Sequence, residues 1–220
     1  MDMVRVHDLK KYFGKEPHLV KALDGISLSV EKGKFTAVLG ASGSGKTTLL
    51  NTIGGLYRPS EGTVIVDGIN LADLDEGELT VFRRRKVGFV FQDYNLIPEL
   101  TIKENMILPL ALDGSVVDQA FFLEIAGLLG LEGRLDAYPH MLSGGGQQCA
   151  AIARALITKP AVILADEPTG SLDAKTGQKV AGLLKRMTET FHQTLVMITH
   201  NMHLAQLADY VVHLQDGRIT

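Results

Sequence analysis

Two short segments of the sequence carry residue types that suit phosphate chemistry. The first reads Gly-Ala-Ser-Gly-Ser-Gly-Lys-Thr at residues 40–47. Glycines at this spacing let the backbone wrap closely enough for its N–H groups to point at phosphate oxygens. The Lys46 side chain can reach the β- and γ-phosphates of a nucleotide, and the Thr47 hydroxyl suits Mg²⁺. These residues predict a phosphate-binding loop.

The surroundings of this loop support the prediction. An apolar, β-branched run at 36–39 indicates a buried strand before it, and a helical stretch follows from Lys46 to about Leu56. The start of that helix adds a positive dipole end. A glycine-rich turn that only opens a helix is the competing interpretation. By itself, the loop does not distinguish a kinase, a GTPase and a motor ATPase.

The second segment is the acid pair Asp166 and Glu167, which follows an apolar run at 161–165. Folds of the α/β class place their chemistry at the C-terminal ends of buried strands. Asp166 fits the role of holding Mg²⁺ directly or through water. Glu167 is placed to polarise a water molecule for in-line attack on the γ-phosphorus. An acid pair that merely starts a loop is the alternative, which the phosphate-binding loop disfavours.

Hydrophobic patterns predict the elements that position these residues. Buried strands are expected at 36–39, 87–91, 161–165 and 195–198. Helices are expected at 46–56, 118–130, 147–157 and around 180–187, and hairpins at 63–68 and 210–217. Because strands alternate with helices, we expect an α/β fold with a P-loop NTPase core and a mostly parallel sheet.

The 220 residues suit a single domain. Residues 93–159 are helix-rich and lack a clear strand, so we expect them to form an inserted helical subdomain. The nucleotide-binding core then comprises residues 1–92 and 160–220, with an antiparallel β subdomain beside the main sheet. A further strand is expected to continue after Gly217, which indicates either a truncated chain or a piece of a longer polypeptide.

Composition restricts the possible partners. The formal net charge is -3, so nucleic acid is not expected as a partner. No apolar run approaches the length of a membrane span, and the N-terminus lacks the apolar core of a signal peptide. If the protein works at a membrane, another chain must supply the spanning part. The single cysteine, Cys149, fits a reducing cytosol.

The one dense basic cluster is the run Arg83–Lys86. We interpret it as a solvated helix face. Docking on a membrane surface or an acidic partner is the alternative.

Residues 142–148, Leu-Ser-Gly-Gly-Gly-Gln-Gln, lie shortly before the acidic strand. This segment resembles the signature sequence of the ATP-binding cassette (ABC) family, and the order of the motifs is that of the family. Ser143, Gly144 and Gly145 would precede a helix, where a hydroxyl, free N–H groups and a positive dipole end suit a γ-phosphate. The resemblance implies that this phosphate belongs to ATP held by the other subunit of a head-to-tail homodimer.

The resemblance also implies roles for single residues. Gln92 would contact Mg²⁺ and the attacking water, His200 would contact the γ-phosphate, and Tyr12 would stack on adenine. The residues expected to cross the dimer interface are Ser171, Leu172 and Asp173. Those expected in catalysis are Glu167, His200, Gln92 and Lys46, and those expected at the metal are Thr47, Gln92 and Asp166. The remaining ATP ligands would be Gly40, Ala41, Ser42, Gly43, Ser44, Gly45, Lys46, Thr47 and Thr48.

Within the family, residues 41–51, 87–98 and 166–173 most resemble small bacterial cassettes of lipoprotein release, macrolide export and antimicrobial-peptide resistance. This implies an ATPase that uses ATP and Mg²⁺ and powers a transporter from the cytoplasmic face of the bacterial membrane. An integral membrane permease would contact it near residues 93–112. The alternative is a regulatory cassette of the cell-division type, which signals through a membrane partner without transport.

Two other classes fit the sequence less well. DNA-associated ATPases of the SMC or repair type share the signature but carry long coiled-coil insertions, and only modest segments separate the motifs here. A metabolic P-loop kinase would not need residues 142–148.

The signature helix departs from the family pattern at two positions. Gly146 stands where Glu, Gln or Met is usual, and Cys149 stands where Arg is usual. Gly146 adds backbone freedom, and Cys149 lacks the cation and planar donors of Arg. These departures bear on the affinity of the dimer rather than on nucleotide binding.

Overall fold

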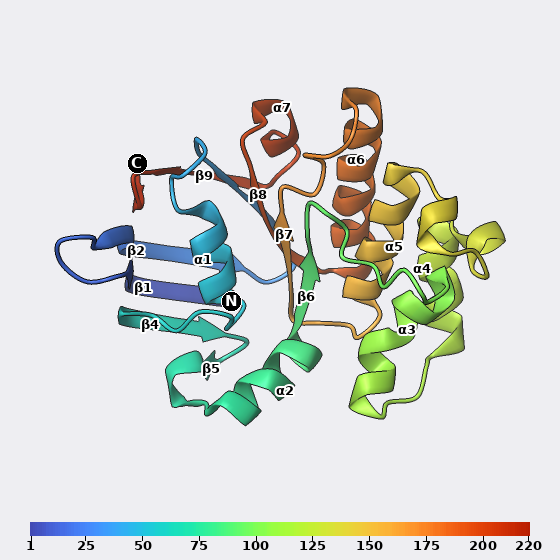
Figure 1. Cartoon of the computed structure of the whole chain (residues 1–220), viewed down its shortest axis with the longest axis horizontal. Coiled ribbons are helices and arrows are strands. Elements are labelled where there is room, and N and C mark those ends of the chain that lie inside the picture. The colour runs from blue at the N-terminus through green and yellow to red at the C-terminus, as the bar shows by residue number, and fades with distance from the viewer.

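The main sheet has six strands (Figure 1). The phosphate-binding loop follows the C-terminal end of one of its inner strands. The computed structural model describes residues 1–220. The strand order is β10-β9-β3-β8-β7-β6, and all neighbouring pairs are parallel except β10 with β9. The strands are β3 (Phe35–Leu39), β6 (Val87–Val90), β7 (Val162–Asp166), β8 (Thr194–Thr199), β9 (Tyr210–Gln215) and β10 (Arg218–Ile219). The predicted α/β fold with a mostly parallel sheet is confirmed.

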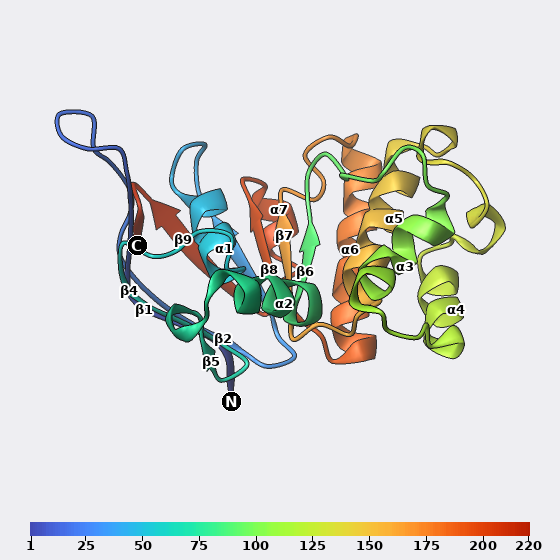
Figure 2. The same ribbon diagram turned by 60° about the horizontal axis from the view of Figure 1, so that its bottom comes forward.

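A second, antiparallel sheet has the order β2-β1-β4-β5. Its strands are β1 (Asp2–Phe13), β2 (Val20–Glu31), β4 (Glu61–Val66) and β5 (Ile69–Asn70). Helix α1 (Lys46–Ile53) lies between the two sheets (Figure 2). Leu50 and Ile53 of α1 share one buried cluster with Val6 of β1 and Val196 of β8. This shared core joins the two sheets around the helix that starts at Lys46.

The opposite face of the main sheet packs against helices. Odd-numbered residues of β8 such as Leu195 and Met197 belong to a second cluster of 28 buried residues, while Val196 and Ile198 face α1. This alternation is the period of two that a strand imposes. The helices on this side are α3 (Ile102–Asp113), α4 (Gln119–Leu128), α5 (Gly144–Leu156) and α6 (Ala174–Phe191). Helix α7 (Met202–Ala205) adds Leu204 and Ala205 to the same cluster, and the remaining α-helix is α2 (Glu76–Lys86). No helix is long and apolar enough to cross a membrane.

Helix α5 begins earlier than the sequence pattern predicts. The expected start at Gln147 is wrong, because the helix starts at Gly144. Ser143 caps it, since its hydroxyl accepts a hydrogen bond from the Gly146 N–H at 3.3 Å. The three glycines therefore form the first turn of the helix rather than a loop before it.

The basic run at the end of α2 is occupied by contacts within the molecule. Arg84 and Arg85 both pair with Asp113 at the end of α3, with N–O distances of 2.7 and 3.0 Å. Lys86 pairs with Asp67 at 2.7 Å, and Arg83 donates to the Gly55 carbonyl oxygen. The run therefore connects α2 to three neighbouring segments, so the interpretation as a merely solvated face is incomplete.

Replacing Asp113 by Asn should lower the unfolding temperature at pH 7. The Ser115 hydroxyl and the Arg85 and Arg84 guanidinium groups hold the pKa of Asp113 below its usual value. A lowered folded-state pKa stabilises the protein above the unfolded pKa, and this stabilisation is lost as the pH falls through the folded pKa. Thermal unfolding should thus separate Asp113→Asn from the wild type at pH 7 but not near pH 2. Asp136→Asn, at an exposed acid, serves as the control and should change neither curve.

Candidate nucleotide-binding and hydrolysis site

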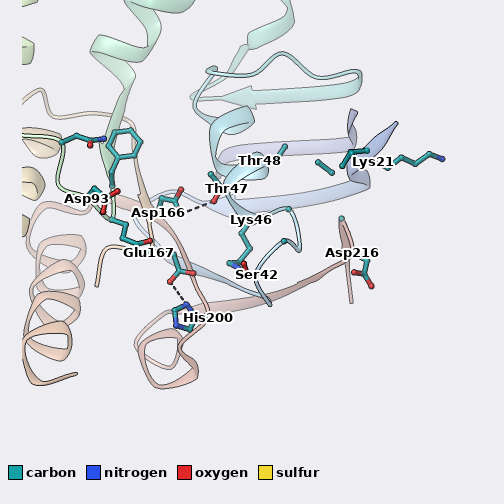
Figure 3. Close-up of a pocket in the computed structure, with 18 residues that line it drawn as sticks. Lys21, Ser42, Lys46, Thr47, Thr48, Asp93, Asp166, Glu167, His200 and Asp216 are labelled. Carbon is teal, nitrogen blue, oxygen red and sulfur yellow. Dashed lines mark hydrogen bonds and ion pairs between the residues drawn. The ribbon is translucent and has the colours of Figure 1, made fainter. Parts of the chain in front are cut away.

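The C-terminal ends of β3, β6, β7 and β8 open into one cavity of about 1080 Å³ (Figure 3). Eighteen residues line it. Ten of them are predicted site residues: Ser42, Gly43, Gly45, Lys46, Thr47, Thr48, Gln92, Asp166, Glu167 and His200. The structure thus brings together residues from four separate parts of the chain.

The loop between β3 and α1 has a backbone conformation that needs glycine. Gly45 has a φ of 102°, and a Cβ atom there would collide with the Ala22 carbonyl oxygen, so only glycine fits. Lys46 is 7% exposed, and its Nζ donates to the carbonyl oxygens of Gly40 at 2.8 Å and Ala41 at 2.9 Å. These contacts hold the ammonium group within the curl of the loop. An anion that entered the loop would meet both the ammonium group and the start of α1.

Asp166 ends β7 directly beside the start of α1. The Thr47 hydroxyl lies 3.4 Å from the Asp166 carboxylate. Burial raises the pKa of Asp166 above its usual value and the nearby Glu167 adds to this, whereas the Thr47 hydrogen bond and the Lys46 ammonium group oppose it. A cation bound here would favour the charged form of this carboxylate.

The donor set around Thr47 and Asp166 fits Mg²⁺. A hydroxyl, a carboxylate and the Gln92 amide line the same cavity, and these are the oxygen ligands that Mg²⁺ prefers. No cluster of three or more His, Cys, Asp or Glu residues surrounds this point. Mg²⁺ usually takes one or two protein carboxylates and completes its shell with phosphate oxygens and water.

Glu167 and His200 lie side by side at the wall of the cavity (Figure 3). The His200 Nδ1 atom lies 2.9 Å from the Glu167 Oε2 atom. Glu167 has a φ of 46°, a left-handed backbone conformation that is uncommon for a residue other than glycine. Its N–H donates to the Ile198 carbonyl oxygen on β8 at 3.1 Å. The strand pairing therefore fixes this carboxylate at the cavity beside the acid that ends β7.

The segment that follows β6 forms hydrogen bonds with two other predicted motifs. The Ser171 hydroxyl donates to the Gln92 carbonyl oxygen at 3.0 Å and lies 3.0 Å from the Tyr94 hydroxyl. Arg154 on α5 donates to the carbonyl oxygens of Tyr94 and Asn95. A shift of α5 would consequently move the segment that contains Gln92.

The other two residues of the predicted interface loop have local structural roles in the single chain. Asp173 caps α6, since its carboxylate accepts from the N–H groups of Lys175 and Thr176 at 3.1 Å. Leu172 is partly buried against the helical cluster.

The start of α5 lies outside the cavity of its own chain, because none of Ser143, Gly144 and Gly145 lines it. Two of the glycines pack tightly against neighbouring side chains. A Cβ atom at Gly144 would lie 2.7 Å from the Tyr94 hydroxyl, and one at Gly145 would lie 2.5 Å from a Thr176 methyl carbon. At Gly146 the nearest neighbour would be Leu142 at 3.3 Å, so this position has more room.

Four further predicted ligands do not line the main cavity. Gly40, Ala41 and Ser44 line a separate cavity of about 340 Å³ beside the phosphate-binding loop. Tyr12 is absent from the lining, and its cross-strand partner Lys21 lines the cavity in its place. The Lys21 Nζ atom lies 5.5 Å from the centre of the Tyr12 ring.

Sequence reasoning missed eight lining residues. They are Val20, Lys21, Ala22, Phe91, Asp93, Asn95, Asp216 and Gly217. Phe91, Asp93 and Asn95 flank Gln92, so their proximity to it was available as a signal. Lys21 and Asp216 come from hairpins, and no sequence pattern shows that these hairpins lie beside the cavity.

Residues 23–170 match the ABC transporter family. The chain belongs to this family. It is 41% identical to the lipoprotein-releasing system ATP-binding protein LolD of Bordetella avium, over 98% of this chain and 95% of that protein. It is 43% identical to the macrolide export ATP-binding/permease protein MacB of Syntrophobacter fumaroxidans, over 100% of this chain but 31% of that protein.

A solved structure of this family matches the whole fold. It is a dimeric, post-hydrolysis state of the ATP-binding cassette MJ0796 of Methanocaldococcus jannaschii, bound to ADP and Pi. The two chains are 42% identical with a TM-score of 0.88, covering 99% of this chain and 96% of the other. The protein studied here is accordingly an ATP-binding and ATP-hydrolysing ABC subunit of the group that includes LolD and MacB.

The cysteine of the ABC signature helix is a core residue. Cys149 is 8% exposed and lies in the apolar cluster beneath α5. Burial raises the pKa of its thiol to about 11. The side chain therefore stays neutral at pH 7 and acts as a small apolar residue.

Replacing Gly146 by Ala should stabilise the protein and leave ATP hydrolysis in place. Alanine is favoured over glycine in a helix by about 1 kcal/mol, and Leu142 needs to give only slightly. Thermal unfolding and steady-state phosphate release check this prediction. Gly144→Ala is the matched control and should destabilise the protein, because its methyl group would press on the Tyr94 hydroxyl. Equal effects of the two changes would contradict the packing described for this turn.

Proposed function

We propose that two copies of this ABC ATPase bind two ATP molecules head to tail and drive a membrane permease. The observation that carries the proposal is the position of Ser143, Gly144 and Gly145. They form a capped helix start with free N–H groups, yet they lie outside the cavity that holds Lys46. A phosphate bound by both motifs would therefore lie between two chains. The dimeric state of MJ0796 supports this arrangement.

The proposed reaction is direct attack of water on the γ-phosphorus. Glu167 accepts a proton from the water as its oxygen forms the new bond to phosphorus. The bond between the γ-phosphorus and the bridging oxygen breaks, giving ADP and phosphate. Lys46 and the partner's Ser143 stabilise the charge that moves onto the phosphate oxygens. His200, which is hydrogen-bonded to Glu167, orients that carboxylate and contacts the γ-phosphate.

Mg²⁺ is proposed as the metal cofactor, held by Thr47, Asp166 and Gln92. When bound, it would neutralise negative charge on the β- and γ-phosphates. At the other end of the nucleotide, Tyr12 is proposed to stack on adenine once the Lys21 side chain leaves its ring.

The permease is proposed to bind a groove beside the segment 93–112. The groove measures about 570 Å³, and its lining includes Phe89 on β6 and Leu108, Pro109 and Leu112 on α3. Leu112 is 66% exposed. An apolar groove of this size suits a short helix of a partner chain. Arg154 also lines it and contacts the segment after Gln92, so a permease bound there would touch a residue linked to the cavity.

Residues 93–159 are proposed to act as the moving subdomain of the single domain 1–220. The proposed cargo is a lipoprotein, a macrolide or an antimicrobial peptide, exported from a position at the cytoplasmic face of a bacterial membrane. The names of LolD and MacB support the first two cargo classes. The name of the bacitracin export ATP-binding protein BceA of Halalkalibacterium halodurans, which is 40% identical over 100% of this chain, supports the third.

The solution mass of Glu167→Gln with and without Mg-ATP tests the proposed dimer. This change keeps the shape of the side chain but removes the proton acceptor, so ATP should stay bound. The mass should double only with Mg-ATP. Adding Ser143→Arg to the same variant should abolish the dimer and leave ATP binding intact, because it blocks only the partner's contribution. A monomer with bound ATP for Glu167→Gln alone would contradict the proposal.

A further inference from the structure

Three side chains from three strands form a hydrogen-bonded chain next to Lys21 and Gly217, two residues that line the cavity. The Tyr12 hydroxyl on β1 donates to the Asp24 Oδ1 atom on β2 at 2.6 Å. Arg218 on β10 donates to the Asp24 Oδ2 atom at 2.8 Å. The Asp24 side chain is 19% exposed, whereas that of Arg218 is 68% exposed. The chain thus crosses from the antiparallel sheet to the main sheet.

The backbone links the same point to the phosphate-binding loop. The Asp24 N–H donates to the Gly217 carbonyl oxygen at 2.9 Å, and the Gly217 N–H donates to the Ser44 carbonyl oxygen at 3.0 Å. Gly217 has a φ of 74°, and a Cβ atom there would lie 2.8 Å from the Ala22 carbonyl oxygen. Gly217 also lines the nucleotide cavity. The turn at Asp216 and Gly217 therefore connects Asp24 to the phosphate-binding loop.

We propose that Asp24 and Arg218 are positioning residues, which hold the Tyr12 ring at a fixed distance from the phosphate-binding loop for adenine. This inference rests on the proposed stacking of Tyr12 on adenine and deepens it. Without an anchor, a partly exposed tyrosine on a strand samples several rotamers, and binding must then restrict it. An anchored hydroxyl removes that loss before the nucleotide arrives.

The charges at this point suit an anchor. Arg218 and Tyr12, in that order, lower the pKa of Asp24 to about 2, so its carboxylate is ionised at neutral pH. The same carboxylate raises the pKa of Tyr12, so the phenol keeps its proton and remains the donor. A phenol bound to an ionised carboxylate is a charge-assisted hydrogen bond, which is shorter and stronger than a neutral one.

A purely structural role for this chain of contacts would be to join β10 to β2. The two roles differ in what they predict for ligands with and without a base. Loss of an adenine-positioning device weakens the binding of ATP but not that of inorganic tripolyphosphate. Loss of a structural link displaces the turn at Gly217, and with it the loop at Ser44, so it weakens both ligands.

Calorimetric titration with ATP and with inorganic tripolyphosphate, in the absence of Mg²⁺ to prevent turnover, tests the inference. Tyr12→Phe, Asp24→Ala and Arg218→Ala should each weaken ATP binding about three- to tenfold, as expected for one lost hydrogen bond. The dissociation constant for tripolyphosphate should stay unchanged. Arg218→Lys should restore much of the ATP affinity, and Tyr12→Phe combined with Asp24→Ala should be no weaker than either alone.

Glu61→Ala is the matched control. It removes an ion pair with Lys10 in the same antiparallel sheet, at a residue that neither lines the cavity nor bonds to Tyr12, Asp24 or Arg218, and should leave both ligands unaffected.

Three results would overturn the inference in distinguishable ways. Equal weakening of ATP and tripolyphosphate by Asp24→Ala and Arg218→Ala would assign these residues a structural role. ATP binding weakened by Tyr12→Ala but unchanged by Tyr12→Phe and Asp24→Ala would show that the ring acts without its anchor. ATP binding unchanged in Tyr12→Ala would remove the proposed adenine contact itself, and the anchor with it.

Discussion

The parallel pairing of β3, β8, β7 and β6 is the constraint on which the rest of the site depends. Leu39 pairs with Thr199, Asp166 with Ile198, and Val90 with Ala165. Because parallel strands end at the same edge, the loops after them meet, and each loop carries a different chemical group. Residues 162–165 of β7 and all of β8 are buried on both faces, so a slip of one residue would exchange side chains between the two apolar clusters and move Asp166 out of the cavity. Core packing therefore fixes the register that places the carboxylates.

Helix α1 packs against the second sheet as well, so it links the position of that sheet to the main one. Its apolar side chains bury against both sheets, so the helix start is held from two sides. Gly45 lies so close to the Ala22 carbonyl oxygen on β2 that a side chain would not fit, and Gly217 also lies close to this oxygen. The loop, β2 and the last hairpin thus form one packed frame, in which Lys46 is held by the carbonyl oxygens of its own loop. The frame is preorganised for a polyphosphate, which lowers the cost of ordering on binding.

The sequence predicted the part of this frame that is made of continuous patterns. Strands buried on both faces appear as apolar runs, so β3, β6, β7 and β8 were located to within one or two residues, and the loop and acid pair follow them directly. The strands β1 and β2 were not located, because charged residues such as Lys10, Lys11 and Lys21 interrupt their apolar pattern. Several register shifts between β1 and β2 then decide that Lys21 lies opposite Tyr12. The anchor formed by Asp24 and Arg218 joins residues 194 positions apart, and no local pattern records such a contact.

The role of Glu167 is tested most directly by the rate of phosphate release in a single turnover. This rate is compared between the wild type and Glu167→Gln at equal ATP occupancy. Glu167, the proposed acceptor of the water proton, directly follows β7 and lines the same cavity as Lys46. We expect Glu167→Gln to bind ATP as the wild type does and to release phosphate about 10²-fold more slowly or slower still. Phosphate release at the wild-type rate, with ATP binding intact, would show that another group activates the water and would contradict the account.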